Sequence, residues 1–356
     1  MRAGAINDLG VTILDSGDET HMHALDTYVG RHKHGTPFHS AAWLMAVEAA
    51  TGNRAVTLAA VAPSGNIAGL LPLHHVRSAL FGQALVSTAF AVDGGILADN
   101  DRVAAMLAQV ARDIATDRGG LPLELRGGAD PGMGWERREG MHVGFVRPIA
   151  ADDDAELQAV PRKHRAELRK ALANANLSVG IGRTAQHLRD HYRIYAESVR
   201  NLGTPVFPAR LFREVLARFG EDADIMIVRD GQRPVSAVLT LYHKGRVMPY
   251  WGGGVADARR LRSNELMYYR LMGHGRARGM TQFDFGRSKV GSGQAAWKKS
   301  FGFAPTPLVY HGWSPDGAAR NVDPNNGKYQ RHIAIWKKLP LPIANFLGPL
   351  ISRGLG

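Results

Sequence analysis

Two short segments late in the chain bring together residue types that could carry out acyl transfer. Residues 283–289 form an apolar run that holds one carboxylate, Asp284, and residues 297–303 place Lys298 among aromatic side chains. A fixed cation lowers the barrier to acyl transfer onto an amine, because the tetrahedral intermediate carries an oxyanion. We therefore expect Lys298 to stabilise that oxyanion and Asp284 to orient or deprotonate the amine. Alternatively, Asp284 anchors a basic side chain and Lys298 is a surface residue beside a core tryptophan.

Aromatic and basic residues around these segments are candidates for binding substrates. Residues 286–293, with three glycines, are long enough to wrap an anionic group with backbone N–H donors. A basic turn at 257–263 could bind phosphates, with Ser263 capping the next helix. The basic helix near 162–170 could do the same or be a solvated surface, and the aromatic residues could equally pack in a core. The expected substrate-binding residues are Arg287, Ser288, Trp297, Phe301, Tyr250, Trp251, Arg259, Arg260, Arg262, Tyr268, Lys163 and Arg165.

The same order of elements occurs twice in the chain. Each copy has a predicted hairpin, a glycine doublet, a helix that ends at glycine and a short strand with a central acid. The doublets begin at Gly94 and Gly253, 159 positions apart, and the acids, Glu124 and Asp284, lie 160 apart. A constant spacing over several elements indicates a duplicated module. The hairpins are expected at residues 56–74 and 225–242, and the helices at 103–118 and 263–278.

Several segments resemble FemAB-type peptidoglycan aminoacyltransferases. The aromatic-Lys-x-x-aromatic-Gly pattern of residues 297–302 and the aromatic-polar-Ser-x-x-Trp pattern of residues 38–43 follow that family, as does the basic helix near 162–170. Residues 201–208 and 336–342 are similar to FemAB-like proteins associated with exosortase and PEP-CTERM systems. The loop at 201–208 could line an acceptor groove or simply connect two helices.

The resemblance implies an α/β (α+β) fold of tandem duplicated GNAT-like (N-acyltransferase) modules, each a mixed twisted sheet flanked by helices. We expect the first module at residues 1–160, the second at 161–310 and a C-terminal tail with an amphipathic and apolar segment at 311–356. No aromatic-lysine segment follows the acidic strand of the first copy. The transfer site is therefore expected in the second module.

The resemblance also implies a function. It predicts an acyl- or aminoacyltransferase that forms an amide on an amine-bearing precursor in cell-envelope or exopolysaccharide biosynthesis, with Lys298 important for transfer. Aminoacyl-tRNA is the prototype donor, and no tightly bound cofactor is expected. Members that use acetyl-CoA bind its pyrophosphate with a glycine-rich turn, whereas residues 257–263 lack those glycines, which favours tRNA or another nucleotide-linked donor.

Two other functions stay open at this point. One is an N-acyltransferase that uses an acyl thioester, on coenzyme A or acyl-carrier protein, to modify an amino sugar. The other is a catalytically silent scaffold that binds RNA or a membrane through its basic half.

Positive charge is concentrated after residue 150. Residues 1–150 carry 12 Lys and Arg against 15 Asp and Glu, a net −3, whereas the remainder carries 32 against 17, a net +15. Such a surface attracts polyanions such as tRNA, or an anionic membrane, although a basic surface also keeps a protein soluble.

The C-terminal tail and the N-terminus bear on where the protein resides. Residues 329–339 have the pattern of a basic amphipathic helix, and residues 341–350 are nearly uncharged. Such a tail either docks on the body or makes peripheral contact with a membrane. Because no signal-like segment opens the chain, we expect a cytoplasmic protein, with the inner face of the cytoplasmic membrane as its site if the tail binds there. The 356 residues include no cysteine and no metal-binding spacing of histidines, so no metal is expected.

Overall fold

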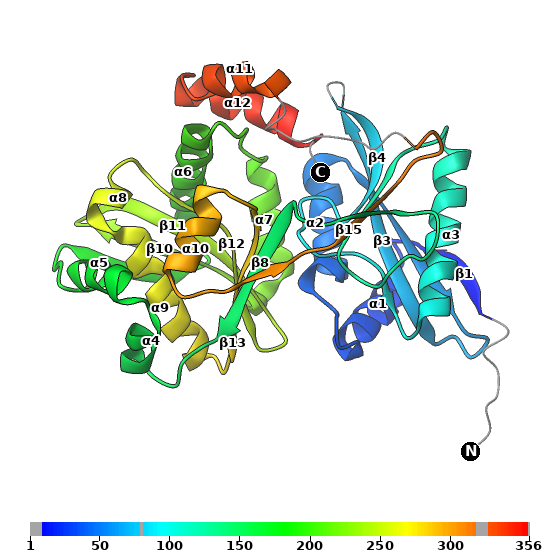
Figure 1. The fold of residues 1–356 in the computed structure, drawn as a ribbon, viewed down its shortest axis with the longest axis horizontal. Helices are drawn as coiled ribbons and strands as arrows, with labels where there is room; N and C mark the ends of the chain where they lie inside the picture. Colours follow the sequence, from blue (N-terminus) through cyan, green and yellow to red (C-terminus); the bar gives the residue numbers. More distant parts are fainter. Residues whose placement is uncertain (1–8, 79–80, 318–326, 355–356) are drawn as a thin grey trace. The chain divides into compact units, whose positions relative to one another are not determined.

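The computed structural model describes residues 9–78, 81–317 and 327–354. The chain divides into two compact units (Figure 1). The first contains Met1–Glu139, Val309–Asp323 and Ile351–Gly356, and the second contains Gly140–Leu308 and Pro324–Leu350. Each unit is built on its own mixed sheet with helices against it, which confirms the predicted tandem α/β fold.

The first unit holds a sheet in the order β1-β2-β3-β4-β6-β15-β7, with β5 paired to β3. All paired strands are antiparallel except β4 and β6. The strands are β1 (Gly10–Leu14), β2 (Arg54–Val61), β3 (Ile67–Ser78), β4 (Gly82–Ser87), β5 (Leu97–Ala98), β6 (Leu123–Arg126), β7 (Glu136–Arg138) and β15 (Tyr310–Trp313). The helices are α1 (Glu19–Arg31), α2 (Ala41–Thr51) and α3 (Asp101–Asp117), with a short 3-10 turn at Pro37–His39.

The second unit holds a sheet in the order β14-β8-β13-β12-β11-β10-β9, in which only β12 and β13 are parallel. The strands are β8 (His142–Pro148), β9 (Leu177–Gly182), β10 (Ala223–Asp230), β11 (Arg233–His243), β12 (Arg246–Gly254), β13 (Gln282–Lys289) and β14 (Pro305–Pro307). The helices are α4 (Asp153–Ala159), α5 (Arg162–Leu172), α6 (Ala185–Leu202), α7 (Ala209–Arg218), α8 (Ala258–Leu261), α9 (Ser263–Ala277), α10 (Gly293–Ser300), α11 (Gly327–Trp336) and α12 (Leu341–Ser352).

Two strands do not pair with the strand that precedes them in the chain but join the sheet of the other unit. Strand β8 comes directly after β7 in the chain but pairs with β13 and β14. Strand β15 comes after β14 but pairs with β6 and β7. The division seen in the structure therefore differs from the expected boundaries at 160 and 310, because the chain enters the second unit at Gly140 and returns to the first at Val309. The expected tail at 311–356 is shared between the two units.

The helices of the second unit cover both faces of its sheet. Neighbouring residues of a strand point to opposite faces, and Trp251 of β12 contacts Phe212 of α7 whereas Gly252 lies against Tyr268 of α9. Helices α6 and α7 therefore cover one face, and α9 covers the other. Helix α10 lies on the same face as α9, because its Trp297 packs against the core cluster to which α9 contributes.

Local sequence explains where several helices begin and end. The side chain of Asn100 accepts a hydrogen bond from Val103 N–H at the start of α3, and Thr184 caps α6 in the same way. Gly203 ends α6 at φ +86°, a conformation that favours glycine. Within the described parts of the chain, no helix combines the length and the apolar character needed to cross a bilayer.

Candidate active site

The parallel strands β12 and β13 part soon after they begin. Their register contains only two pairs, Arg246 with Gln282 and Val247 with Phe283. Beyond these pairs β12 continues to Gly254 and β13 to Lys289. We call the region between the two unpaired stretches the strand opening.

A β-bulge lies on each side of the strand opening. In β12, Tyr250 is an extra residue between the pairs that Pro249 and Trp251 make with β11. In β13, the register with β8 shifts between Asp284 and Arg287. Bulges re-aim backbone and side chains and are frequent beside active sites, so both edges of the opening are shaped locally.

The α9 side of the opening is lined by aromatic rings. The Tyr268 ring centroid lies 4.9 Å from that of Phe285 and 5.3 Å from that of Trp297. A Cβ on Gly252 would stand 3.0 Å from the Tyr268 hydroxyl, so the phenol reaches β12. Burial, aided by nearby Glu265, raises the pKa of Tyr268 to about 12, and its hydroxyl therefore stays protonated as a donor.

Lys298 extends from α10 to the bulge in β13. Its ammonium donates to the carbonyl oxygens of Phe285 at 2.7 Å and Arg287 at 3.2 Å, with Gly286 O at 3.5 Å. The Nζ also lies 5.3 Å from the ring centroid of Phe145. Burial lowers the pKa of Lys298 to about 8, although Asp284 opposes the change. Lys298 is therefore a partly desolvated cation that braces the bulge, and not the surface residue of the alternative interpretation.

Asp284 lies at the same bulge and holds its backbone. One carboxylate oxygen accepts a hydrogen bond from Gly286 N–H at 2.8 Å, and the other lies 3.8 Å from an Arg246 guanidinium nitrogen. Burial raises the pKa of Asp284. The Arg246 contact fits the interpretation in which Asp284 anchors a basic side chain, and the bond from Gly286 N–H also fixes the bulge.

The prediction of a glycine loop at 286–293 is wrong for residues 286–289, which belong to a strand. Strand β13 continues to Lys289, and Arg287 and Ser288 pair with Gly144 and Val143 of β8. Ser288 is buried. Backbone groups committed to a sheet ladder do not form an open cradle for an anion, because their directions are set by the neighbouring strand.

The opposite face of β12 carries a second aromatic group. Trp251 packs against Phe207 and Phe212, with ring centroids 6.2 and 4.8 Å away. Tyr250 lies 5.0 Å from Trp251, and buried His191 of α6 lies 2.6 Å from the Trp251 carbonyl oxygen. Because Phe207 belongs to the loop at 201–208, that loop contributes to this face.

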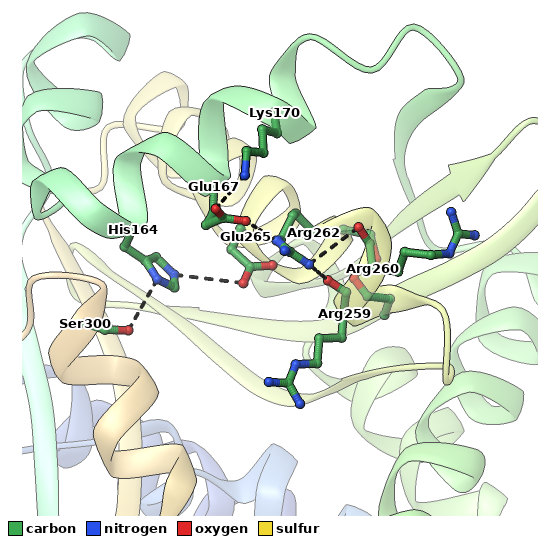
Figure 2. Close-up of polar contacts among 10 residues, drawn as sticks. His164, Glu167, Lys170, Arg259, Arg260, Arg262, Glu265 and Ser300 are labelled. Atoms are coloured by element: carbon green, nitrogen blue, oxygen red, sulfur yellow. Dashed lines mark hydrogen bonds and ion pairs between the residues drawn. The ribbon is translucent and has the colours of Figure 1, made fainter.

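The three arginines of the turn before α9 differ in their contacts (Figure 2). The Arg262 guanidinium is bonded to Glu167 of α5 and to the Arg259 carbonyl oxygen. Arg260 is exposed and lies 3.7 Å from Asp257. The guanidinium of exposed Arg259 has no hydrogen-bond or ion-pair partner among the residues that the structure describes. Arg259 and Arg260 are thus better placed than Arg262 to meet an anion.

Ser263 does not cap α9 as expected. Its buried hydroxyl pairs with that of Ser236 at 2.6 Å, and Arg262 occupies the cap position at φ +58° without a side-chain cap bond. In α5, the Arg165 guanidinium donates to the Val160 and Gln158 carbonyl oxygens, whereas Lys163 is exposed. The Arg165 guanidinium therefore caps the C-terminal end of α4 and is less available to a phosphate than the Lys163 ammonium.

The sequence patterns did not single out His164 of α5, which contacts both α9 and α10 (Figure 2). The His164 Nδ1 atom lies 3.4 Å from the Ser300 hydroxyl of α10, and Nε2 lies 3.9 Å from a Glu265 carboxylate oxygen of α9. Its ring packs edge-on against Trp297 and Phe301. Burial lowers the pKa of His164, so the neutral ring holds α5 against the helices beside the opening.

Comparison with known proteins identifies the fold. Residues 159–299 match the family described as Acetyltransferase (GNAT) domain. The crystal structure of FemX superposes with a TM-score of 0.64 at 16% identity, covering 84% of this chain and 96% of that one. No curated protein matches the chain in sequence.

Two further solved structures share the fold along most of their length. The C-terminal domain of a putative lysylphosphatidylglycerol synthetase from Agrobacterium fabrum has a TM-score of 0.56 at 13% identity, over 94% of this chain and 97% of that one. A tandem GNAT protein from the clavulanic acid biosynthesis pathway has a TM-score of 0.54 at 12% identity, over 86% and 98%. Together with the matched domain, these likenesses show the tandem GNAT fold.

Proposed function

We propose that this acyltransferase joins an acyl or aminoacyl group to an amine at the strand opening of the second unit, and that it acts in cell-envelope or exopolysaccharide biosynthesis. The observation that carries the proposal is the desolvated Lys298 ammonium beside an opening between parallel strands, with a bulge on each edge. The envelope setting, including the association with exosortase and PEP-CTERM systems, rests on the FemAB resemblance of the sequence.

The chemistry needs one bond made and one broken. The acceptor nitrogen attacks the carbonyl carbon of an activated ester or thioester, and the carbonyl oxygen becomes an oxyanion. Collapse of this intermediate forms the amide, breaks the bond to the leaving oxygen or sulfur, and passes the amine proton to the leaving group. A cation close to the oxyanion stabilises the intermediate. Lys298 would supply it, while Asp284 keeps the bulge in the shape that presents the cation.

Aminoacyl-tRNA is the donor that we favour. Arg259, Arg260 and Lys163 are exposed cations on helices α8 and α5, and phosphates bind such side chains well. The lysylphosphatidylglycerol synthetase among the similar structures is named for an aminoacyl product. The tandem GNAT protein, whose description mentions AcCoA, supports an acyl thioester as the second candidate donor.

A donor panel separates the two candidates. Purified protein is given labelled aminoacyl-tRNA, acyl-CoA or acyl-carrier protein with an amine-bearing glycan precursor, with and without ribonuclease. Transfer that ribonuclease abolishes supports tRNA, and transfer from a thioester that ribonuclease leaves intact excludes tRNA as a requirement. Absence of turnover with every donor, with binding of RNA or vesicles retained, would favour the silent scaffold.

The role of Lys298 is tested with its exposed neighbour as control. We expect Lys298→Ala to lower transfer at least tenfold, and Lys299→Ala to leave it within about twofold. Because Lys298 also braces β13, thermal unfolding of each variant is followed by circular dichroism. A folded Lys298→Ala variant with full activity would remove this residue from the mechanism.

A further inference from the structure

Helix α12 has two unlike faces. Ala344 is buried, and Gly348 packs so closely on Val206 that a Cβ there would stand 2.9 Å from the valine side chain. On the other side, Ile343, Phe346 and Leu350 are 47%, 74% and 53% exposed. Residues three and four positions apart share one face of a helix, so these three form a continuous apolar surface, which we call the α12 stripe.

The α12 stripe reverses the usual pattern of a surface helix. In such a helix the apolar residues face the core and the polar residues face water. Here Ala344 and Gly348 face the body of the second unit, and three large apolar side chains face outward. Contiguous exposed apolar side chains rimmed by polar residues are typical of interaction sites.

The stripe belongs to a folded element and not to a loose tail. Arg200 of α6 donates to the carbonyl oxygens of Lys337 and Leu339, between α11 and α12. Ile333 of α11 lies so close to Gly203 that a Cβ there would meet it at 2.5 Å. Both helices therefore rest on the segment that follows α6, and α12 presents its stripe in a fixed orientation.

Charge indicates what the stripe meets. From Pro324 to the end the sequence holds five Lys and Arg and no Asp or Glu. Lys337 and Lys338 are exposed, and Ile335 beside them is 62% exposed. Apolar side chains with basic neighbours suit an anionic bilayer surface, where rings and aliphatic groups enter the interface while ammonium groups meet headgroup phosphates.

We propose that helices α11 and α12 form a peripheral docking surface for an anionic phospholipid bilayer, with the α12 stripe entering the interface and Lys337 and Lys338 on the headgroups. This surface is separate from the strand opening and does not depend on the identity of the acyl donor. Peripheral docking of this kind requires no spanning helix.

Co-sedimentation of the full chain with vesicles tests the proposal. Vesicles of equal parts phosphatidylglycerol and phosphatidylcholine should bind the protein at least tenfold more tightly than vesicles of phosphatidylcholine alone, and added salt should weaken binding. The double variant Phe346→Ser, Leu350→Ser should bind at least tenfold more weakly. Met133→Ser is the matched control, because Met133 is 94% exposed in the first unit and lies outside the stripe.

A charge variant and a measurement of molar mass separate vesicle binding from unfolding and from dimer formation. Lys337→Gln, Lys338→Gln keeps the stripe intact and should still weaken binding about tenfold, so the proposal remains testable if the apolar variant unfolds. Wild type that fails to bind mixed vesicles, or equal losses with Met133→Ser, would overturn the proposal. Light scattering in the absence of lipid tests for a dimer. A dimer that Phe346→Ser dissociates, with vesicle binding unchanged, would also overturn the proposal, because the stripe would then pack against a second copy of the chain.

Discussion

The two units differ most at corresponding places in their sheets. In the second unit β12 departs from regular pairing with β11 by one residue, Tyr250, and soon separates from β13. In the first unit, β3 pairs through His74 with Val86 of β4 and through Leu70 with Leu97 of β5. Ten residues, 87–96, therefore lie opposite only three residues of β3. Three pairs join β4 to β6. The first unit thus carries a ten-residue loop where the second has a single extra residue.

One position shows how the filling is achieved. Arg126 ends β6, and its guanidinium donates to the carbonyl oxygens of Thr88 and Ala91 in the inserted loop and to Glu124. The residue 160 positions later is Gly286, which has φ +62° and no atom within 4 Å of where a Cβ would stand. A long cation ties the loop down in one unit, whereas the other has no side chain at all. The first sheet is therefore closed at this place by a loop and a side chain, whereas β13 has only backbone there.

Removing the cation that closes the first unit should have the largest effect. The Arg126 side chain is only 8% exposed, and Arg126→Ala leaves Glu124 and two carbonyl groups without it. We expect the free energy of unfolding in urea to fall by about 3 kcal/mol. Arg137→Ala, at a side chain 55% exposed, should change it by less than about 0.5 kcal/mol. A loss below about 1 kcal/mol for Arg126→Ala would contradict the assigned role.

Adding a methyl group at the edge of the strand opening comes next. A Cβ at Gly252 would stand 3.0 Å from both the Tyr268 hydroxyl and a methyl group of Val238. Gly252→Ala should lower the free energy of unfolding by about 2 kcal/mol and also slow transfer, because α9 must shift. Gly180→Ala, where a Cβ meets nothing within 4 Å, is the control. Tyr268→Phe combined with Gly252→Ala should recover part of the loss, and no recovery would point to Val238 alone.

The pH dependence of transfer probes the cation in the second unit. The pKa of Lys298 is lowered to about 8 in the folded protein from its ordinary 10.5. Transfer should therefore fall about tenfold per pH unit above pH 8 as the ammonium is lost. Lys298→Arg, which stays charged, should remove this decline in the rate. A rate profile of Lys298→Arg identical to that of wild type would assign the decline to another group.

Stability should move in the opposite direction over the same pH range. Because burial disfavours the charged lysine, the folded state releases its proton before the unfolded state does. The contribution of Lys298 to the free energy of unfolding therefore rises between about pH 8 and pH 10.5. Urea unfolding at several pH values, compared with Lys298→Arg, isolates this contribution.

The smallest expected effect comes from the bulge glycine itself. Gly286→Ala places a Cβ in open space but at a positive φ, which costs about 1 kcal/mol of folding free energy. Transfer should stay within about threefold of wild type, which corresponds to about 0.6 kcal/mol in activation free energy. Gly293→Ala, at the first position of α10 and without positive φ, should be neutral or stabilising in urea. Loss of transfer without loss of stability would show that the opening tolerates no added side chain.

Local patterns made much of the fold predictable. The hairpins at 56–74 and 225–242 are β2–β3 and β10–β11, and the helices near 103–118 and 263–278 are α3 and α9. Both acidic strands, β6 and β13, are present. Such elements follow from hydrophobic periodicity and from turn and cap residues, which act within a few positions of the chain.

The remaining features depend on contacts between distant segments. The sequences of strands β8 and β15 do not specify which sheet each strand joins. The bulge at Tyr250 arises from its register with β11, and the carbonyl contacts of Lys298 arise from how α10 lies on β13. His164 stands among basic residues in a helix, and only the packing of α5 on α9 and α10 distinguishes it. Side-chain roles of this kind require the tertiary structure.

The strand exchanged into the first sheet affects how the protein is made. Strand β15 inserts between β6 and β7, yet Tyr310 is translated 172 positions after Arg138. At about 5–20 residues per second, the ribosome needs roughly 10–35 s to reach it. Throughout that time β6 and β7 lack their shared partner, and an unpaired strand edge invites association with other chains. The first unit therefore depends on the synthesis of the second, and a chain that stops before β15 would be a client for chaperones and proteases.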